Sequence, residues 1–537
     1  MTPQPITMPF EEALLIEYMS DVTCREAIRS IRTGGGREDG FRFLFFKIGA
    51  EMHACMADGL TLAVTVEDQG TTLVANGYRG SSSACELGPG TQHVSIPKEL
   101  LEVGENVLAV KGRCTVETLS YLPLPRSPEA PNRHASCPGL DNGPVGSAAA
   151  FLCDSVIRMP DTSPFKGSCY CFYDYDNQCY RKPCWLWSDA PAVAALFQAA
   201  ELAPESSRAD RYRETALAIA RTLLRHQVTD RSDPNFGALV SRYRYYAHSP
   251  KSFDCLLGPN DTSFIVKWAL MPSYRATGDE TFLQRSKWAL DWLIEVINGH
   301  DYVPSQYYAD AGRWEDGAFI DSGFTSEGLR EFAEIVPSHK QDCVESIHTF
   351  MQRFVAQFKM ENGYYNMNYS PTRGTYAKLF ARGHGWALEG LLAAYEATRE
   401  MSYLDEAVAI AERLRDNQTP EGAWPFLLGE GAPDDETKRD TGICEKGTAL
   451  LGYLFHRLAD ASGSAEFIPA ADRALDWCEH NMVLQAGPGH GGIASRSMGS
   501  GIVGNHFLRV ATGYANAFYI LGALCRAERS ATVKDRS

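Results

Sequence analysis

The sequence lacks long apolar runs and has few basic residues relative to acidic ones. No stretch reaches the roughly 18 to 20 apolar residues of a membrane-spanning helix, and the start, MTPQPITMPFEEALLIEY, has neither a basic opening nor a signal-peptide core. Lys and Arg number 51 against 67 Asp and Glu, which gives a formal net charge of −16. Nucleic acid and anionic membranes both attract basic surfaces. The composition therefore disfavours both partners, whereas an acidic small substrate needs only two or three local cations.

The cysteines also lack an ordered pattern. There are 15 of them, an odd number, and no spacing typical of a small disulfide-bonded domain. Cys169, Cys171, Cys179 and Cys184 crowd one segment, but their spacing does not match the paired CxxC motifs of a zinc knuckle. A zinc site is conceivable there, and buried thiols are the favoured interpretation. With no export signal visible, we expect reduced thiols and a cytoplasmic protein. The sequence contains no pattern of metal ligands above background.

Two regions of different hydrophobic period are present. Within residues 1–125, runs such as FRFLFFKIGA and LTLAVTVED alternate between turn-forming clusters and predict a small β-sandwich domain. Residues 126–142 are rich in Pro and predict a linker. Residues 143–530 have a helical period. The sandwich fits a carbohydrate-binding role and a structural role equally well, and a homodimer is one form that the latter could take.

The helical region predicts an all-α (α/α)6 toroid, a six-hairpin barrel. The segments SYRATGDETFLQRSKWALDWLI and AYEATREMSYLDEAVAIAERL are near repeats, and repeated helical hairpins build a closed toroid or an open solenoid. Six hairpins fit closure, with the inner helices starting at one face. The expected helices cover residues 143–157, 189–203, 208–227, 262–277, 281–298, 322–336, 340–359, 383–399, 403–417, 441–460, 467–480 and 509–527.

Aromatic and polar residues crowd the loops before the expected inner helices. Examples are FYDYDNQCYRKPCWLWSDAP and GYYNMNYSPTRGTYAKLFARGHGW. Sugars bind by stacking on aromatic rings while side chains hydrogen-bond their hydroxyls. Such loops also pack over the core of any helical barrel. An oligosaccharide is nevertheless the ligand that this feature favours.

Two carboxylates and one Arg–His–Trp segment are the candidate chemical groups. Asp261 in GPNDTSF and Asp321 in AFIDSGF each begin an apolar helix, and cleavage at a glycosidic centre uses one proton donor and one charge-stabilising group. Each Asp could instead be an ordinary helix N-cap. Arg382 and Trp386, in ARGHGW with His384, are four residues apart on one helical face. They could grip a sugar carboxylate, or Arg382 could pair with a neighbouring carboxylate while Trp386 fills the core.

At this point the order of motifs over roughly 150–527 resembles glycoside hydrolase families 88 and 105, the unsaturated glucuronyl and galacturonyl hydrolases. Asp261 followed by YRATGDETFL is similar to the first active-site segment, and RWEDGAFIDSGF to the segment that carries the principal acid/base, Asp321. ARGHGW is similar to the RGQAW or RGNGW segment. The resemblance implies that Arg382 and Trp386 face the substrate, with His384 beside them.

The remaining motifs extend this resemblance. GAWPF followed by KRDTG, with Trp424 and Arg439, is similar to a late motif pair, and WLWSDAP with Trp187 occupies the place of the first barrel loop. The substrate-facing His of the families corresponds most nearly to Asn366, next to Tyr365. The resemblance implies that these residues bind substrate.

The implied activity is the removal of a terminal 4,5-unsaturated uronic acid from an oligosaccharide by hydration of its double bond, without a cofactor. Four alternatives stay open: a glycosidase acting on saturated uronides, a polysaccharide lyase that uses Tyr364, Tyr365 or His384 as base, a sugar epimerase, and a non-catalytic carbohydrate-binding protein. An enzyme needs both Asp261 and Asp321 in one pocket beside Arg382, whereas a binding protein can lose either carboxylate and still bind.

Overall fold

A computed structural model gives the arrangement of both regions. The structure describes residues 6–9, 41–48, 56–67, 71–75, 85–97, 104–111, 114–123, 143–156, 167–176, 178–181, 186–202, 207–243, 255–309, 312–376, 379–428, 441–497 and 508–536.

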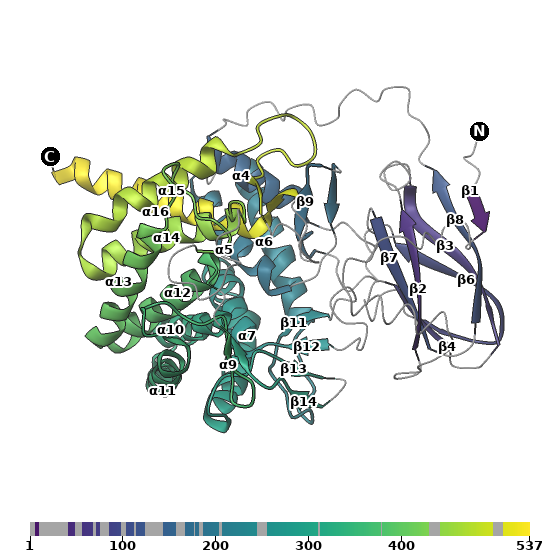
Figure 1. Ribbon diagram of the computed structural model, residues 1–537, viewed down its shortest axis with the longest axis horizontal. Coiled ribbons are helices and arrows are strands. Elements are labelled where there is room, and N and C mark those ends of the chain that lie inside the picture. The colour runs from purple at the N-terminus through teal and green to yellow at the C-terminus, as the bar shows by residue number, and fades with distance from the viewer. Residues whose placement is uncertain are drawn as a thin grey trace.

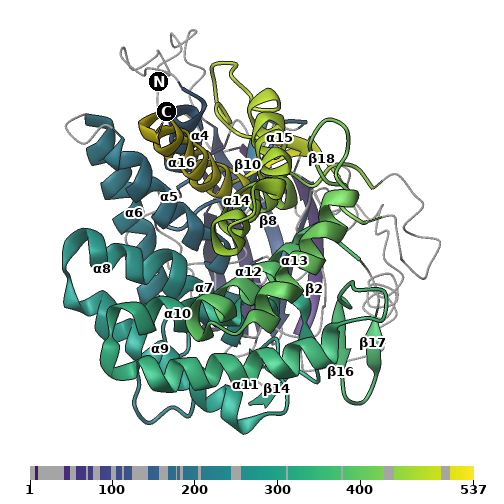
Figure 2. The same ribbon diagram turned by 90° about the vertical axis from the view of Figure 1, so that its left-hand side faces the viewer.

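Within the described residues, six helical segments form a closed inner ring. Each contacts the next along the chain, and the last contacts the first, so the barrel closes rather than opening into a solenoid. Figure 2 shows this ring with a second layer of helices around it. The inner segments are α5 (Ala190–Glu201), α7 (Pro259–Ile265) with η4 (Val266–Leu270) and α8 (Met271–Thr277), α10 (Ser326–Ile335), α12 (Ala381–Thr398), α14 (Glu445–Ser462) and α16 (Gly513–Arg536).

The outer helices pack against the inner ring, and most of them contact two neighbouring inner segments. Those of residues 207–225, 280–299 and 340–358 are amphipathic, with buried residues at three- and four-residue spacing and charged residues toward solvent. Every one of the expected helical ranges holds a helix, and among the described residues none is both long and apolar enough to cross a membrane. The outer helices are α4 (Pro144–Asp154), α6 (Ser207–Arg225), α9 (Glu280–Gly299), α11 (Lys340–Phe358), α13 (Met401–Asp416) and α15 (Ile468–His480).

The sequence repeat corresponds to a repeated corner at the end of three inner helices. Thr277 and Thr398, the last residues of α8 and α12, each donate a side-chain hydrogen bond four residues back, at 2.7 Å. The next residues, Gly278 and Arg399, have left-handed φ angles of 67° and 63°. Gly463 after α14 has the same conformation, with φ of 69°. This corner turns each inner helix into its outer partner.

One inner helix is locally widened. The segment from Pro259 to Thr277 changes to a π-helix over Val266–Leu270 before it continues as α8. Pro272 has no backbone N–H and cannot bond the carbonyl of Trp268, so the wider turn falls where a helical hydrogen bond is lost.

Short strands edge the end of the barrel at which the inner helices start (Figure 1). All their pairings are antiparallel. One sheet has the order β10 (Cys179–Arg181), β9 (Phe172–Asp174), β19 (Arg509–Thr512), β18 (Ala494–Arg496); the second β11 (Val240–Tyr243), β12 (Cys255–Leu257), β13 (Tyr307–Tyr308), β14 (Arg313–Trp314); the third β15 (Ala318–Phe319), β16 (Asn368–Ser370), β17 (Gly374–Tyr376).

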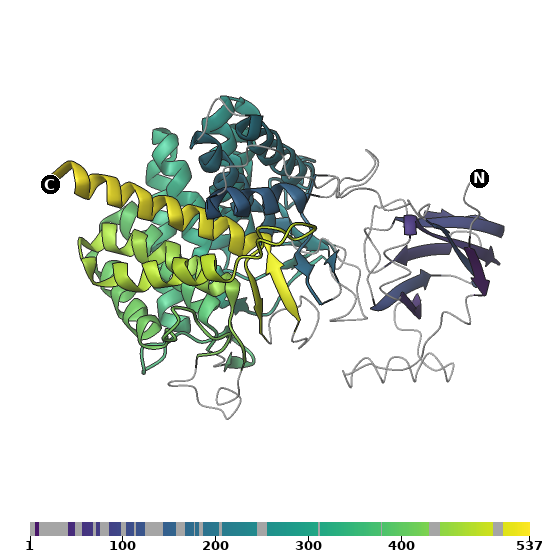
Figure 3. The ribbon, with the colours of Figure 1, turned by 90° about the horizontal axis from the view of Figure 1, so that it is seen from above.

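The N-terminal strands form two antiparallel four-stranded sheets, seen at the N-terminal end of the chain in Figure 3. Over residues 61–66 of β3 every second residue is buried, including Leu62 and Val64, as expected for a strand with one covered face. One sheet has the order β1 (Ile6–Pro9), β8 (Cys114–Pro123), β3 (Met56–Val66), β6 (Gly90–Pro97), and the other β2 (Phe41–Ile48), β7 (Gly104–Lys111), β4 (Thr71–Ala75), β5 (Cys85–Leu87).

Candidate active site

A cleft of about 630 Å³ opens where the inner helices begin. It is lined by side chains from inner helices and from the second and third short sheets. Five of the predicted site residues lie in its wall, and they come from four separate places along the chain. They are Trp187, Asp261, Asp321, Arg382 and Trp386.

Asp261 occupies the first turn of α7. It is only 3% exposed, although it lines the cleft. Gly258, the residue before the helix, approaches it closely: a Cβ atom there would lie 2.5 Å from Oδ2 of Asp261. The adjacent Thr262 accepts a hydrogen bond from the backbone of Leu239 at 3.2 Å, which ties this helix start to the sheet beside it. Asp261 is thus held in a crowded and mostly dry position.

Asp321 lies in η5 (Ile320–Thr325), the short 3₁₀ turn between β15 and α10, and is half-buried. The backbone N–H of Ile320 donates to the carbonyl of Met367 at 2.9 Å, so the strand pairing continues to the residue before Asp321. Behind the turn, Gly323 packs against α12: a Cβ on Gly323 would lie 2.8 Å from the carbonyl oxygen of Trp386. The same contact therefore fixes Asp321 relative to the helix that carries Arg382 and Trp386.

Arg382 lies in the first turn of α12 between two aromatic rings. Its guanidinium carbon is 4.7 Å from the ring centroid of Trp386 and 5.9 Å from that of Tyr514. It makes no ion pair with any carboxylate in the described part of the chain. The described residues therefore favour the first interpretation of the Arg–Trp spacing, in which Arg382 faces the cleft and is available to a sugar carboxylate.

Aromatic rings build the wall behind these groups. Trp386 is 2% exposed and donates from Nε1 to the hydroxyl of Tyr514 at 3.0 Å. The ring of Trp187 lies 6.1 Å from that of Trp386, at an angle of 73°. Both rings are thus core side chains whose remaining edges reach the cleft, which gives the site a rigid apolar floor.

Four other predicted substrate contacts do not line the cleft. His384 is fully buried, its Nε2 accepts from the backbone of Tyr365 at 3.2 Å, and burial lowers its pKa to about 4. The hydroxyl of Tyr365 donates to Glu406 at 3.3 Å. Asn366 donates to the carbonyl of Phe358 at 3.2 Å, and Trp424, fully buried, donates to the carbonyl of Leu414 at 2.6 Å.

The helical period explains one of these differences. Residues two apart on a helix point about 200° apart around its axis, whereas residues four apart share a face. Arg382 and Trp386 face the cleft together, so His384 must face the outer layer. Arg439 and Cys184 lie outside the described residues, as does the side chain of Cys179.

The cleft also contains residues that the sequence did not single out. Asn368 and Arg373 come from the β16–β17 hairpin, and Asp316 precedes β15. Arg373, in the turn of the hairpin, donates to the backbone carbonyl of Asp316 at 2.7 Å, which ties the hairpin to the segment before β15 at the rim. A signal for Asn368 was present, since it lies two residues after Asn366 in an aromatic loop, but only the strand pairing distinguishes the two.

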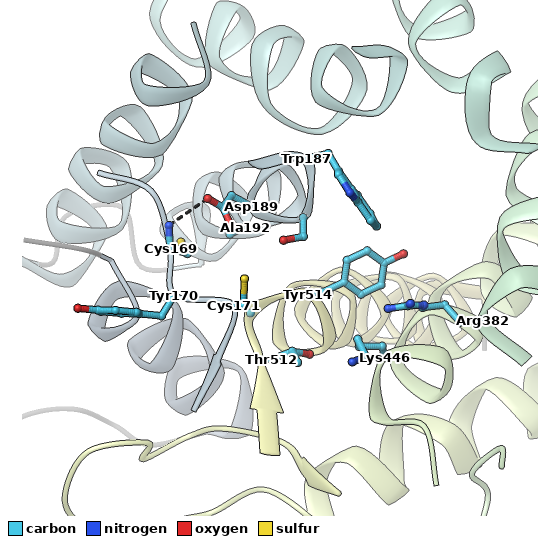
Figure 4. A pocket seen from close by; sticks show the side chains of 12 residues that line it. Cys169, Tyr170, Cys171, Trp187, Asp189, Ala192, Arg382, Lys446, Thr512 and Tyr514 are labelled. Atoms are coloured by element: carbon cyan, nitrogen blue, oxygen red, sulfur yellow. Dashed lines mark hydrogen bonds between the residues drawn. The ribbon is translucent and has the colours of Figure 1, made fainter. Parts of the chain in front are cut away.

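A side pocket of about 40 Å³ adjoins the cleft and shares Trp187 and Arg382 with it. Figure 4 shows Tyr514 between these two residues and Asp189 on the far side. Asp189 accepts hydrogen bonds from Ser168 at 2.6 Å and from the backbone of Cys169 at 3.0 Å. Burial raises the pKa of Asp189 to about 7, and these two hydrogen bonds moderate that rise. Asp189 thus anchors the loop that carries Cys169 and Cys171.

Below the cleft, buried charges fill the barrel interior. Lys267 pairs with Glu331 at 2.6 Å, and Arg457 pairs with Glu396 at 2.8 Å. Glu389, two turns beyond Arg382, accepts from Trp268 Nε1 at 3.2 Å. Burial, and then the nearby charge of Glu327, raise the pKa of Glu389 to about 8. Within the described residues, no group of three or more His, Cys, Asp and Glu side chains is arranged to hold a metal ion.

No protein-family model and no curated protein sequence matches the chain. Solved structures do match. An unsaturated glucuronyl hydrolase responsible for glycosaminoglycan degradation, from Bacillus sp. GL1, superposes with a TM-score of 0.55 at 14% identity, over 72% of this chain and 96% of that one. An unsaturated glucuronyl hydrolase specific for heparin gives 0.54 at 14% identity over the same shares.

A third structure shows that this fold is not limited to one reaction. Cellobiose 2-epimerase from Bacillus thermoamylovorans B4167 matches with a TM-score of 0.52 at 14% identity, over 71% of this chain and 99% of that one. At such identities the likeness defines the fold and not the chemistry. The predicted resemblance is confirmed at that level: the helical region has the α/α-toroid fold of the unsaturated glucuronyl hydrolases.

Proposed function

We propose that the protein is a glycoside hydrolase that removes a terminal 4,5-unsaturated uronic acid from an oligosaccharide. The observation that carries this proposal is the meeting of Asp261, Asp321 and Arg382 in one aromatic-walled cleft. A proton donor, a second carboxylate and a cation for a sugar carboxylate are the groups that the reaction requires. The solved glucuronyl hydrolases with this fold support the same class of substrate.

In the proposed mechanism, Asp321 donates its proton to C4 of the C4=C5 double bond, and positive charge develops at C5 and the ring oxygen. Water adds at C5 as Asp321 takes back a proton. The resulting hemiketal opens, breaks the link to the neighbouring sugar and releases it. Asp261 stabilises the developing charge, and Arg382 holds the uronate against the Trp187 and Trp386 wall. No metal and no organic cofactor takes part.

The half-buried position of Asp321 suits this role. A proton donor must reach both the substrate and water, and Asp321 is the more exposed of the two carboxylates. Asp261, at 3% exposure, lies in the first turn of α7 and is shielded from bulk water. The two carboxylates thus have different surroundings and are assigned different tasks.

The rival reactions have less support. A polysaccharide lyase needs a base that reaches the C5 proton, and the three candidates in the sequence are all buried: Tyr364, Tyr365 and His384 are 3%, 0% and 0% exposed. None of them lines the cleft. A purely sugar-binding protein has no need for two carboxylates beside the cation, and a glycosidase on saturated uronides remains the nearest alternative.

The test follows the ultraviolet absorbance of unsaturated uronyl disaccharides from pectin, glycosaminoglycan and ulvan digests after the purified protein is added. Loss of absorbance is the expected result, because the reaction consumes the conjugated double bond. A rise in absorbance on intact polymer would identify a lyase. Release of sugar from saturated uronides alone would identify an ordinary glycosidase.

The remaining proposals concern the whole chain. We propose that the two N-terminal sheets face each other as the sandwich domain of residues 1–125, that residues 126–142 link it to the barrel of residues 143–530, and that the protein acts in the cytoplasm. Assembly as a homodimer also stays a prediction.

A further inference from the structure

Several side-chain polar atoms in the cleft wall are buried without a hydrogen-bond partner in the described part of the chain. Among them are Oγ of Ser241, Oδ1 of Asn368 and Nε of Arg382. Buried polar atoms in folded proteins are nearly always hydrogen-bonded, because leaving one unmet is costly. A group of such atoms in one cleft therefore points to a ligand that supplies the missing partners.

The Asn368 oxygen and the Arg382 nitrogen require hydrogen-bond partners of opposite kinds. An amide oxygen only accepts, so its partner must carry a hydrogen, such as a hydroxyl group. The guanidinium nitrogen only donates, so its partner must be an acceptor, for which a carboxylate is the strongest choice. The complementary ligand carries a hydroxyl group and an acid group on one small frame, as a uronic acid does.

Strand pairing places Asn368 beside the proposed acid/base. Asn368 pairs with Phe319 across the β15–β16 ladder, and paired residues point their side chains to the same side of a sheet. Phe319 also lines the cleft, and Asp321 follows it by two residues. Met367, next to Asn368, accepts the backbone hydrogen bond of Ile320 at 2.9 Å. A sugar that reaches Asp321 therefore passes the Asn368 amide.

We infer that Asn368 is a substrate-positioning residue that reads a free ring hydroxyl of the uronide. The inference rests on the proposed function for the identity of that sugar. In a 4,5-unsaturated uronide, C4 belongs to the double bond and O1 to the glycosidic link. The hydroxyls left on the ring are those at C2 and C3, so Asn368 accepts from one of these. A sulfate ester at that position has no proton to donate and places oxygen against oxygen.

The test compares Asn368→Leu with the matched variant Asn366→Leu. Leu is close to Asn in size and removes the acceptor. For Asn368→Leu we expect kcat/KM on an unsulfated unsaturated disaccharide to fall about 10- to 100-fold, with a Tm equal to or above that of the wild type, because an unmet buried polar atom is gone. Asn366 donates to Phe358 instead of facing the cleft. Asn366→Leu should lower Tm and keep kcat/KM.

A second arm uses the 2-O-sulfated form of the same disaccharide. If the wild type rejects the sulfated sugar and Asn368→Leu accepts it, Asn368 contacts the C2 hydroxyl. If the wild type accepts the sulfated sugar while Asn368→Leu is still slower on the unsulfated one, Asn368 contacts the C3 hydroxyl. An Asn368→Leu protein with kcat/KM within twofold of the wild type, or with a lowered Tm as its main change, would overturn the inference.

The positioning role of Asn368 can be tested even if the proposed hydrolase activity is not found. If the wild type consumes no unsaturated uronide, calorimetric titration with D-glucuronate replaces the rate. Weaker binding by Asn368→Leu than by the wild type then upholds the positioning role without the hydrolase activity. Equal binding by the two proteins, or no binding by either, overturns it.

Discussion

A Cβ atom placed on Gly390 would lie 1.7 Å from the carbonyl oxygen of Gly323. Gly390 is on α12, which carries Arg382 and Trp386, and Gly323 is in the turn that carries Asp321. The two backbones touch because neither residue has a side chain. The distance between the proposed acid/base and the proposed uronate-binding cation thus depends on a contact behind the site.

Gly390→Ala should therefore damage stability and activity together. An atom at 1.7 Å from backbone cannot be accommodated without moving α12 or the Asp321 turn, and we expect a loss of about 3 kcal/mol or more. Urea unfolding and kcat/KM measure the two effects. Gly143→Ala is the control, since a Cβ there meets nothing within 4 Å. Equal stability of the two variants would contradict the packing account.

We expect Lys at position 382 not to support the substrate binding that we assign to Arg382. Lys keeps the charge but loses the planar fork and the stacking over Trp386 and Tyr514. We expect kcat/KM to fall about 10- to 100-fold, mainly through KM, because charged hydrogen bonds to a substrate contribute about 1.5–3 kcal/mol. The exposed Arg213→Lys serves as the control. Full activity of Arg382→Lys on uronides would remove Arg382 from the site.

The raised pKa of Glu389 should make the free energy of unfolding depend on pH. Its folded pKa of about 8 lies above its ordinary value of 4.5, so the folded state binds the proton more tightly than the unfolded state. Its contribution to the free energy of unfolding is thus present below pH 4.5 and is lost as pH rises toward 8, by at most about 1.4 kcal/mol per pH unit.

Urea unfolding at pH 5, 6, 7 and 8 measures this effect. The wild type should lose stability over this range relative to Glu389→Gln, which cannot ionise. Asp189 acts in the same direction, but its pKa of about 7 places most of its effect at lower pH. Parallel pH profiles for the two proteins would show that Glu389 does not titrate there.

Arg399 offers a test of the repeated corner. It adopts φ of 63°, where Gly278 and Gly463 stand in the two equivalent corners. Arg399→Gly should stabilise the protein by about 1 kcal/mol, because a non-Gly residue in this conformation is strained. Gly278→Ala should destabilise it by a similar amount, although nothing lies within 4 Å of its Cβ position. Thermal unfolding of both variants measures these changes, and an Arg399→Gly protein less stable than the wild type would contradict the strain at this corner.

These corners also explain what the sequence could predict. Helix positions depend on local periodicity and on corner residues such as Thr277 and Gly278, so each expected helical range holds a helix. Asp261, Asp321 and Arg382 share a cleft because each lies at the start of an inner helix or in the turn just before it, and the inner helices of a closed toroid begin at one face. These features follow from the repeat alone.

The remaining site residues depend on information that the repeat does not contain. His384 and Trp424 carry suitable chemistry but point into the core, since helical phase and packing with the outer layer decide which polar groups stay accessible. In NGYYNMNY, Asn366 and Asn368 are two apart, and their roles differ because β16 begins only at Asn368. The pairing of β16 with β15, which is distant in the sequence, places Asn368 in the cleft wall.

The most direct test of the central claim is the initial rate of absorbance loss on an unsaturated uronyl disaccharide, measured for the wild type and for Asp321→Asn. The account predicts that the wild type consumes the double bond and that Asp321→Asn, folded and with an unchanged Tm, is slower by about 10²- to 10⁴-fold. An Asp321→Asn protein that retains the wild-type rate would contradict it.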